Sequence, residues 1–169
     1  MTSQRWLGWL VAALSAALLL TLLVQHAAPT VEGPDRLAAA AMVEMVNAER
    51  VEQGVEPLVA ADDIATVAEE WSAAMALAAA MDHNPAYAEQ ICCWSVVTEN
   101  VAWAQAPRLW SPTDPVLRLT RELHEGLMSS PGHRANILDS DVDEVGIGVH
   151  VDGEGSVWIT QNFRRRETG

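Results

Sequence analysis

The chain has 169 residues, half of them hydrophobic, and a formal net charge of -13 from 23 acidic and 10 basic residues. Every basic residue is arginine, and consecutive arginines occur only at Arg164–Arg166. Because phosphate binding requires a cationic surface, this balance argues against nucleic acid as a partner. The length suits one domain, and the apolar content suffices for a core, which excludes wholesale disorder.

An uncharged stretch near the N-terminus runs from Trp6 to Val24 and is preceded by Arg5. It exceeds the core of a usual signal peptide and nearly spans a bilayer, and no clear Ala-x-Ala cleavage site follows it. We therefore expect residues 1–28 to be a cleaved signal peptide or a retained transmembrane anchor, followed by a linker at residues 29–35. Either form uses the membrane as a partner and places the rest of the chain outside the cytoplasm, secreted or membrane-anchored.

The spacing of apolar residues predicts two long helices in the first half of the remaining chain. The first runs from Asp35 to about Gln53 and is ended by Gly54. The second begins near Asp62 and is closed by Asp82–Pro85, because proline lacks a backbone donor and restricts the residue before it. The apolar stripe of the first helix consists of Ala39, Met42, Val43 and Val46, with Arg50 on another face.

The segment at residues 86–95 lacks a clear period and contains Cys92 and Cys93, the only cysteines in the chain. Two adjacent cysteines cannot link distant parts of the domain to each other. In an oxidising compartment they would form a strained vicinal disulfide, pair between molecules, or remain buried thiols. We favour buried thiols, because free cysteine behaves as a small apolar residue.

Residues 96–103 alternate as a strand does, and this register places Glu99 on the same face as Val97, Val101 and Trp103. A carboxylate buried without a partner costs several kcal/mol, so this register predicts a cationic or hydrogen-bonding neighbour for Glu99. The alternative is that this end of the strand is open and Glu99 is solvated.

A third long helix begins at Thr113–Pro115 and stops at a Ser-Ser-Pro-Gly corner. At this corner Ser130 is suited to cap a new short helix and Pro131 to open it. His133 would then lie in the first turn of that helix, at a rigid position. The corner is therefore a candidate site for a titratable ring.

Two further segments, 144–151 and 156–163, read as the strands of a hairpin joined by a Gly-rich turn. Gly146 and Gly148 share one face of the first of these strands, which leaves room for something to approach the backbone closely. The order of the predicted elements implies an α+β fold, in which helices cover a small antiparallel sheet.

Several segments resemble, in matching order, those of the CAP superfamily of cysteine-rich secretory, antigen-five and pathogenesis-related proteins, in its compact bacterial form with an SCP-like domain. Together they span about residues 37–163. The matching segments are Val46–Arg50, Asp82–Pro85, Thr98–Ala102, Ser130–Leu138, Val145–Val149 and Trp158–Phe163.

The resemblance implies a three-layer α-β-α sandwich at residues 36–163, followed by a basic tail at 164–169. It also implies a central cleft where two histidines and acidic side chains converge. Carried over by motif, the histidines are His83 and His133, and one acid is Glu99. The second acid of the family comes from the helix before the Gly-His motif, where Glu122 and Glu125 align only loosely.

The first functional hypothesis is an exported, non-catalytic binding module for a lipid-like or other small extracytoplasmic ligand, or for a divalent cation. The ligand-binding cleft would contain His83, Glu99 and His133. No cofactor is required, but His83 and His133 are the candidate ligands of a divalent ion such as zinc.

Two alternative functions assign different roles to these residues. In a peptidase-like hydrolase, His83, Glu99 and His133 would be the catalytic residues. A protein of cell-envelope adhesion or assembly would use the acidic surface and need no cleft chemistry. We expect His124 and His150 to be ordinary surface or sheet residues, since His124 lacks the second histidine of a zincin motif.

Overall fold

The computed structural model describes residues 33–105 and 114–167 of the chain. The expected signal peptide or anchor at residues 1–28 lies outside the described residues, as does the expected linker up to residue 32. Among the helices in the described ranges, none is both long enough and apolar enough to cross a bilayer.

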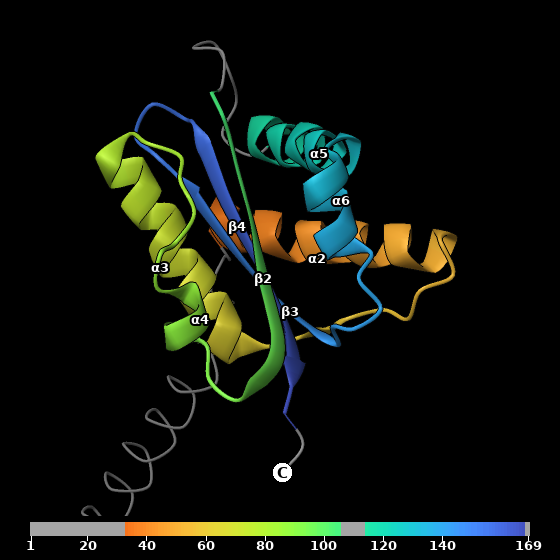
Figure 1. The fold of residues 1–169 in the computed structure, drawn as a ribbon. Helices are drawn as coiled ribbons and strands as arrows, with labels where there is room; N and C mark the ends of the chain where they lie inside the picture. Colours follow the sequence, from red (N-terminus) through yellow and green to blue (C-terminus); the bar gives the residue numbers. More distant parts are fainter. Residues whose placement is uncertain (1–32, 106–113, 168–169) are drawn as a thin grey trace, which may run out of the picture. The chain divides into compact units, whose positions relative to one another are not determined.

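The described residues form three layers, with a sheet between two layers of helices (Figure 1). The helix α3 covers one face of the sheet, while α2, α5 and α6 lie on the other. This layering confirms the predicted α+β class and the α-β-α sandwich. The helices are α2 (Pro34–Glu52), α3 (Asp62–Ala78), α5 (Asp114–Ser129) and α6 (Pro131–Ile137).

The sheet has the strand order β1-β3-β4-β2, so β2 forms one of its edges. The strand pairs β2–β4 and β3–β4 are antiparallel, and the latter is the predicted hairpin. The short β1 adds a parallel pair with β3, which a period of two residues could not reveal from the sequence. The strands are β1 (Val59–Ala60), β2 (Trp94–Ala104), β3 (Glu144–Val151) and β4 (Val157–Arg166).

The end of β4 corrects the expected boundary of the domain. Arg164–Arg166 belong to the strand, so the basic tail does not begin after residue 163. Arg164 is fully buried, and its guanidinium group contacts Asp63 of α3 at 2.7 Å and Glu144 of β3 at 2.6 Å. These two carboxylates make burial of the arginine tolerable and keep this end of the strand in the fold.

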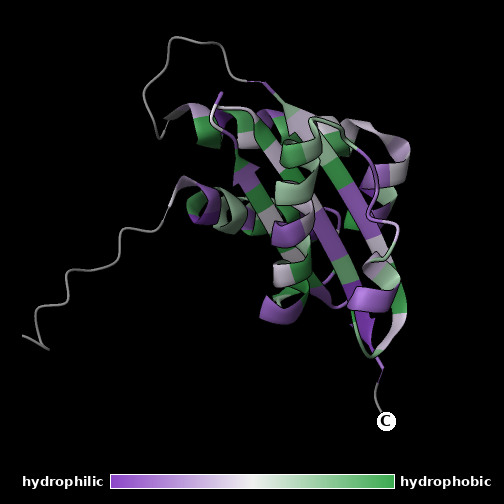
Figure 2. Cartoon of the chain, turned by 90° about the vertical axis from the view of Figure 1, so that its left-hand side faces the viewer, coloured by the Kyte–Doolittle hydropathy of each residue, from purple (hydrophilic) through white to green (hydrophobic). Residues whose placement is uncertain are grey.

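The main core lies between the sheet and the layer that contains α2. Ile147, Ile159 and Phe163 of the sheet belong to one buried cluster with Met42 and Val46 of α2. Hydrophobic and hydrophilic residues follow one another along the strands (Figure 2). This alternation is expected where the two faces of a sheet meet different surroundings.

The opposite face of β3 carries glycines where α3 crosses it. A Cβ atom at Gly148 would lie 2.1 Å from the carbonyl carbon of Ala68, and one at Gly146 would lie 2.3 Å from the amide nitrogen of Ala65. The close approach predicted from these glycines is therefore the approach of α3 to the sheet.

We had expected Arg50 to lie on an outer face of the first helix, but it is buried. Its side chain is 1% exposed and donates hydrogen bonds to the carbonyl oxygens of Glu56, Ile137 and Asp139 at 2.7–2.8 Å. Helix ends leave carbonyl groups without partners, and a long cationic side chain can satisfy several at once. Arg50 thus fastens the end of α6 to α2.

The segment expected to be an irregular loop contains the short helix α4 (Tyr87–Gln90) and the start of β2. Ile91 is 2% exposed, whereas Cys92 and Cys93 are both exposed, so the expectation of buried thiols is wrong. Ile91 anchors this segment in the fold, and the two following side chains face solvent.

Candidate functional site

The candidate site lies at β2, the edge strand of the sheet. The helix α3 ends at Ala78, earlier than predicted, because Ala79 adopts a left-handed conformation with φ of 49°. The chain then turns back in a loop that carries His83 to β2. On the other side, Ser130 and Pro131 stand at the start of α6 as predicted, although the Ser130 side chain makes no capping hydrogen bond, and His133 lies in the first turn. Both histidines therefore reach the edge strand from segments that follow a helix end.

Glu99 of β2 is the buried centre of this arrangement, with a side chain that is 1% exposed. Its Oε1 accepts hydrogen bonds from His83 Nδ1 and from the Asn84 backbone amide, both at 2.9 Å. Burial raises the pKa of Glu99, although the bonds from Asn84 and His83 act in the opposite direction. The hydrogen-bonding neighbour that the strand register predicted for Glu99 is thus present.

His133 is joined to the same strand through its backbone and through Asn136 of α6. Asn100 Nδ2 donates to the His133 carbonyl oxygen at 3.1 Å. Asn136 Nδ2 donates to the Glu99 carbonyl oxygen at 3.3 Å and to Asn100 Oδ1 at 2.8 Å. Burial lowers the pKa of His133, and its electrostatic interaction with His83 lowers it further. The His83–Glu99 pair and His133 thus border the same part of β2, and we call these three residues the His83–Glu99–His133 cluster.

Asn100, Asn136 and Gln161 support the cluster, and the residue patterns alone did not single them out. Asn100 Nδ2 also donates to Gln161 Oε1 at 3.0 Å, so the network continues into β4. All three residues lie within segments that matched the family motifs, which is the signal that could have found them.

Comparison with known proteins decides the family. A model described as "CAP: Cysteine-rich secretory protein family" matches residues 43–163. The chain belongs to this family.

One relative and two solved structures illustrate the similarity. The uncharacterized protein YkwD of Bacillus subtilis (strain 168) is 30% identical over 130 residues, which are 72% of this chain and 45% of YkwD. The chain thus spans less than half the length of this relative. An extracellular protein containing a SCP domain from Bacillus anthracis has a TM-score of 0.61 and 22% identity, over 78% of this chain and 41% of that one. A structure of NaASP2 with Zn2+ has a TM-score of 0.53 and 13% identity, over 78% of this chain and 86% of that one.

The second acid of the family site is not supplied by either glutamate of this CAP chain that aligned loosely with it. Glu122 and Glu125 are both exposed on α5, and Glu122 pairs with Arg118 at 3.0 Å. None of the contacts of the described residues joins them to the His83–Glu99–His133 cluster. The turn of α5 instead directs Leu127 into the core.

His124 is buried in this CAP domain, although we had expected an ordinary surface or sheet residue. It is 4% exposed, and its Nε2 lies 3.9 Å from Glu49 Oε1 of α2. Burial lowers the pKa of His124, while the nearby carboxylates oppose that shift. Within the described residues its ring nitrogens have no hydrogen-bond partner, and it does not contact the cluster.

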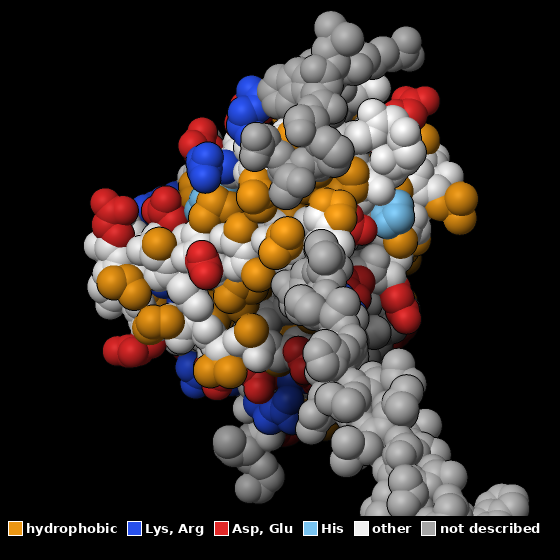
Figure 3. Space-filling model, turned by 180° about the vertical axis from the view of Figure 1, so that it is seen from behind, with side chains coloured by type: hydrophobic (Ala, Val, Ile, Leu, Met, Phe, Trp, Pro, Cys, Tyr) orange, Lys and Arg blue, Asp and Glu red, His pale blue; other side chains and the backbone are white. Residues whose placement is uncertain are grey.

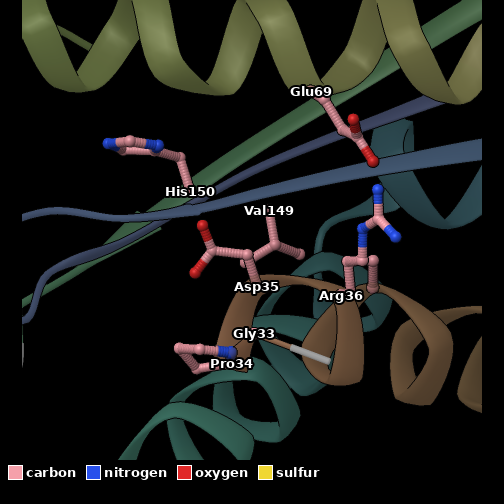
Figure 4. Close-up of a pocket in the computed structure, with 8 residues that line it drawn as sticks. Gly33, Pro34, Asp35, Arg36, Glu69, Val149 and His150 are labelled. Atoms are coloured by element: carbon pink, nitrogen blue, oxygen red, sulfur yellow. The ribbon is translucent and has the colours of Figure 1, made fainter. Parts of the chain in front are cut away.

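Two cavities among the described residues of the CAP domain lie away from the cluster. One of about 490 Å³ lies between the N-terminal end of α2 and α3, over β3 (Figure 4). Arg36 of α2 and Glu69 of α3 point toward one another there, and His150 projects from β3. A neighbouring cavity of about 410 Å³ also includes Arg36 and Glu69. Neither is lined by a residue of the cluster, and their charged groups make them mixed rather than purely apolar.

The donor set of the cluster limits which metal site it could form. No group of three or more His, Cys, Asp and Glu side chains in the described ranges is arranged to hold a metal ion. His83 is 57% exposed, whereas Glu99 is almost inaccessible. The described residues therefore show no complete metal site, and His83 and His133 stay candidate ligands by motif.

Proposed function

We propose that this CAP domain is an extracytoplasmic, non-catalytic binding module that holds a divalent cation, zinc by preference, through His83 and His133. The observation that carries the proposal is the 2.9 Å hydrogen bond between His83 Nδ1 and Glu99 Oε1. When a carboxylate accepts from Nδ1–H, the neutral imidazole keeps its proton there and Nε2 becomes the free electron-pair donor.

Glu99 orients His83 in this proposal and is not itself a ligand. Its Oε1 already accepts from His83 and from the Asn84 amide, and its side chain is 1% exposed. A carboxylate behind a ligating histidine fixes the ring and raises its basicity.

The second imidazole fits the same role. Burial lowers the pKa of His133, which keeps the ring neutral at physiological pH and able to donate an electron pair. The hydrogen bonds of Asn100 and Asn136 hold α6 against β2, so His133 does not depend on a flexible loop. A bound zinc ion would offer its remaining positions to water or to one donor atom of a small ligand.

The choice of ligand and compartment has separate support. The NaASP2 structure contains Zn2+ in a protein of similar fold. The two described cavities between α2 and α3 lie away from both histidines, and Arg36 and Glu69 make them poorly suited to a lipid-like ligand. The uncharged stretch before the domain and the extracellular SCP-domain protein of Bacillus anthracis support an extracytoplasmic location.

One observation favours a hydrolase as the second candidate. A buried carboxyl group with a raised pKa beside an imidazole is an arrangement that general acid–base catalysis uses. Neither Glu122 nor Glu125 supplies a second acid among the described residues, which favours binding over catalysis. An adhesion or assembly role through the acidic surface would involve neither His83 nor His133.

Calorimetric titration of the full chain with zinc chloride tests the binding proposal. We expect one site, with an affinity reduced about tenfold or more by His83→Ala or His133→Ala, and about 10–100-fold by Glu99→Gln, which removes the orienting charge. His150→Ala is the matched control, because His150 lies on β3 outside the cluster, and it should bind as the unmodified chain does.

Unchanged zinc affinity in both cluster histidine variants would refute the proposal. Turnover of peptide substrates by the unmodified chain, lost in both variants while their circular dichroism stays native, would replace binding with hydrolysis. A defect in envelope assembly caused only by reversing surface acids would favour the adhesion role.

A further inference from the structure

Cys92 and Cys93 form a pair of exposed thiols between α4 and β2. They are the only cysteines of the chain. The Sγ atoms of Cys92 and Cys93 lie 2.6 Å apart. The two side chains therefore lie on the same side of the backbone.

The backbone conformation explains this juxtaposition. Consecutive side chains of an extended strand point to opposite sides, which would separate two adjacent sulfurs. Cys93 instead has a φ of +61°, in the left-handed region that non-glycine residues rarely adopt. Such a conformation persists only where neighbouring groups enforce it.

The C-terminal end of β4 holds this conformation in place. Arg164 Nη1 donates to the Cys92 carbonyl oxygen at 3.2 Å, and the Glu167 amide donates to the Cys93 carbonyl oxygen at 2.8 Å. Arg164 is itself buried and bound to Asp63. Both cysteine carbonyl groups are thus attached to a rigid part of the sheet, and the two sulfurs stay close without a bond between them.

We propose that Cys92 and Cys93 are a reversible oxidation site that closes a vicinal disulfide within one chain. A thiolate of the pair attacks one sulfur of a small disulfide such as oxidised glutathione, forms a mixed disulfide and releases one glutathione thiolate. The second cysteine thiolate then attacks the cysteine sulfur of that mixed disulfide and displaces the second glutathione. Two electrons pass from the cysteines to the oxidant, and the two released glutathione thiolates take up the two protons that the cysteine thiols gave up.

The surroundings of the pair suit this exchange. Both thiols are accessible to a soluble oxidant, and an adjacent partner sulfur makes the second step faster than attack by another molecule. The adjacent Cys92 thiol raises the pKa of Cys93, while Arg166 and Arg164 act against that shift by favouring the thiolate. A disulfide between adjacent residues is strained, and strained disulfides are readily reduced, so the site is reversible rather than structural.

Thiol counting on the full chain tests the proposal. The reduced chain is incubated with oxidised glutathione, denatured in N-ethylmaleimide, and weighed by intact mass spectrometry. We expect a monomer that takes up no label, is lighter by two hydrogens, and regains two labels after dithiothreitol. The inference is independent of zinc binding, because neither cysteine belongs to the His83–Glu99–His133 cluster.

Cys92→Ser and Cys93→Ser are the matched controls. Each retains one thiol without an adjacent partner, so glutathione should remain attached to it as a stable adduct. Uptake of two labels by the oxidised unmodified chain, a stable glutathione adduct on it, or a dimer on a non-reducing gel would each overturn the proposal.

Discussion

The environment of Glu99 opposes the ionisation of its carboxyl group. Its side chain is 1% exposed, and only one of its two oxygens receives hydrogen bonds, while Oε2 has no partner among the described residues. Transfer of a charge from water into such a site costs free energy that two hydrogen bonds offset only in part. The consequence is a raised pKa for Glu99 in the folded chain.

This raised pKa predicts a pH dependence of stability. A carboxyl group whose pKa is higher in the folded state favours folding fully below its unfolded pKa of about 4.3, and this contribution is lost as the pH rises through the folded value. Glu99→Gln removes that loss. We therefore expect the free energy of unfolding of the variant, relative to the unmodified chain, to increase from about pH 4 to pH 7.

Urea unfolding followed by tryptophan fluorescence, with a chelator present, measures this difference. Glu122→Gln is the control, since Glu122 is exposed and its removal should leave the pH profile parallel to that of the unmodified chain. A Glu99→Gln profile that is also parallel would show that the burial of Glu99 does not affect its ionisation.

At the scale of elements, the position of α3 depends on the two glycines of β3. Because the atoms that a Cβ at Gly148 would meet belong to the backbone of Ala68 and Glu69, a side-chain rotation cannot relieve the clash. The helix itself would have to move away from the sheet. The loop that carries His83 begins just after α3, so such a shift also displaces one half of the site.

Gly148→Ala is therefore expected to lower the free energy of unfolding by about 3 kcal/mol, at the upper end of the cost of overpacking a core. Gly132→Ala is the matched control, because a Cβ at Gly132 in α6 would meet no atom within 4 Å. Alanine in a helix is favoured over glycine, so this control should be neutral or stabilising by up to about 1 kcal/mol. Equal destabilisation of both variants in urea unfolding would contradict the close approach of α3.

At the scale of the whole molecule, the dominant feature is the excess of negative charge. The net charge is -13, and the face seen in Figure 3 carries acidic side chains in several separate places with some arginines between them. Repulsion among like charges opposes the compact state. Surface ion pairs such as Arg118–Glu122 contribute little against it, since exposed pairs are worth at most about 1 kcal/mol.

Salt should consequently stabilise the fold. Raising sodium chloride to about 0.5 M makes the screening length much shorter than in a dilute buffer. The repulsion among the many acidic side chains is then weakened more than the attraction within the few exposed ion pairs. We expect an increase in Tm of a few degrees, as about 1 kcal/mol shifts a chain of this size by roughly 2–4 °C. The exposed Glu44→Lys substitution makes the net charge less negative and should reduce this response. A Tm that falls with salt would contradict this account.

Local rules of sequence determined most elements of the CAP fold. Apolar periodicity located α2 and the start of α3, Ser130 and Pro131 marked the start of α6, and strand alternation found the β3–β4 hairpin. These features are readable because each depends on neighbours within a few residues along the chain. The motifs also singled out His83 and Glu99, which a hydrogen bond joins, and His133, whose backbone carbonyl is bonded to Asn100 of the same strand.

Tertiary structure alone decided which polar groups are buried. Arg50, His124 and Arg164 are each at most 4% exposed, and nothing in the local pattern distinguishes them from solvated residues. Arg50 satisfies carbonyl groups more than eighty residues away, and Arg164 contacts Asp63 of α3, about a hundred residues earlier, so their burial depends on partners that a local pattern does not contain. The same reason explains the cysteines: residues from the far end of the chain hold the Cys92 and Cys93 carbonyl groups, and only the assembled sheet brings those residues there.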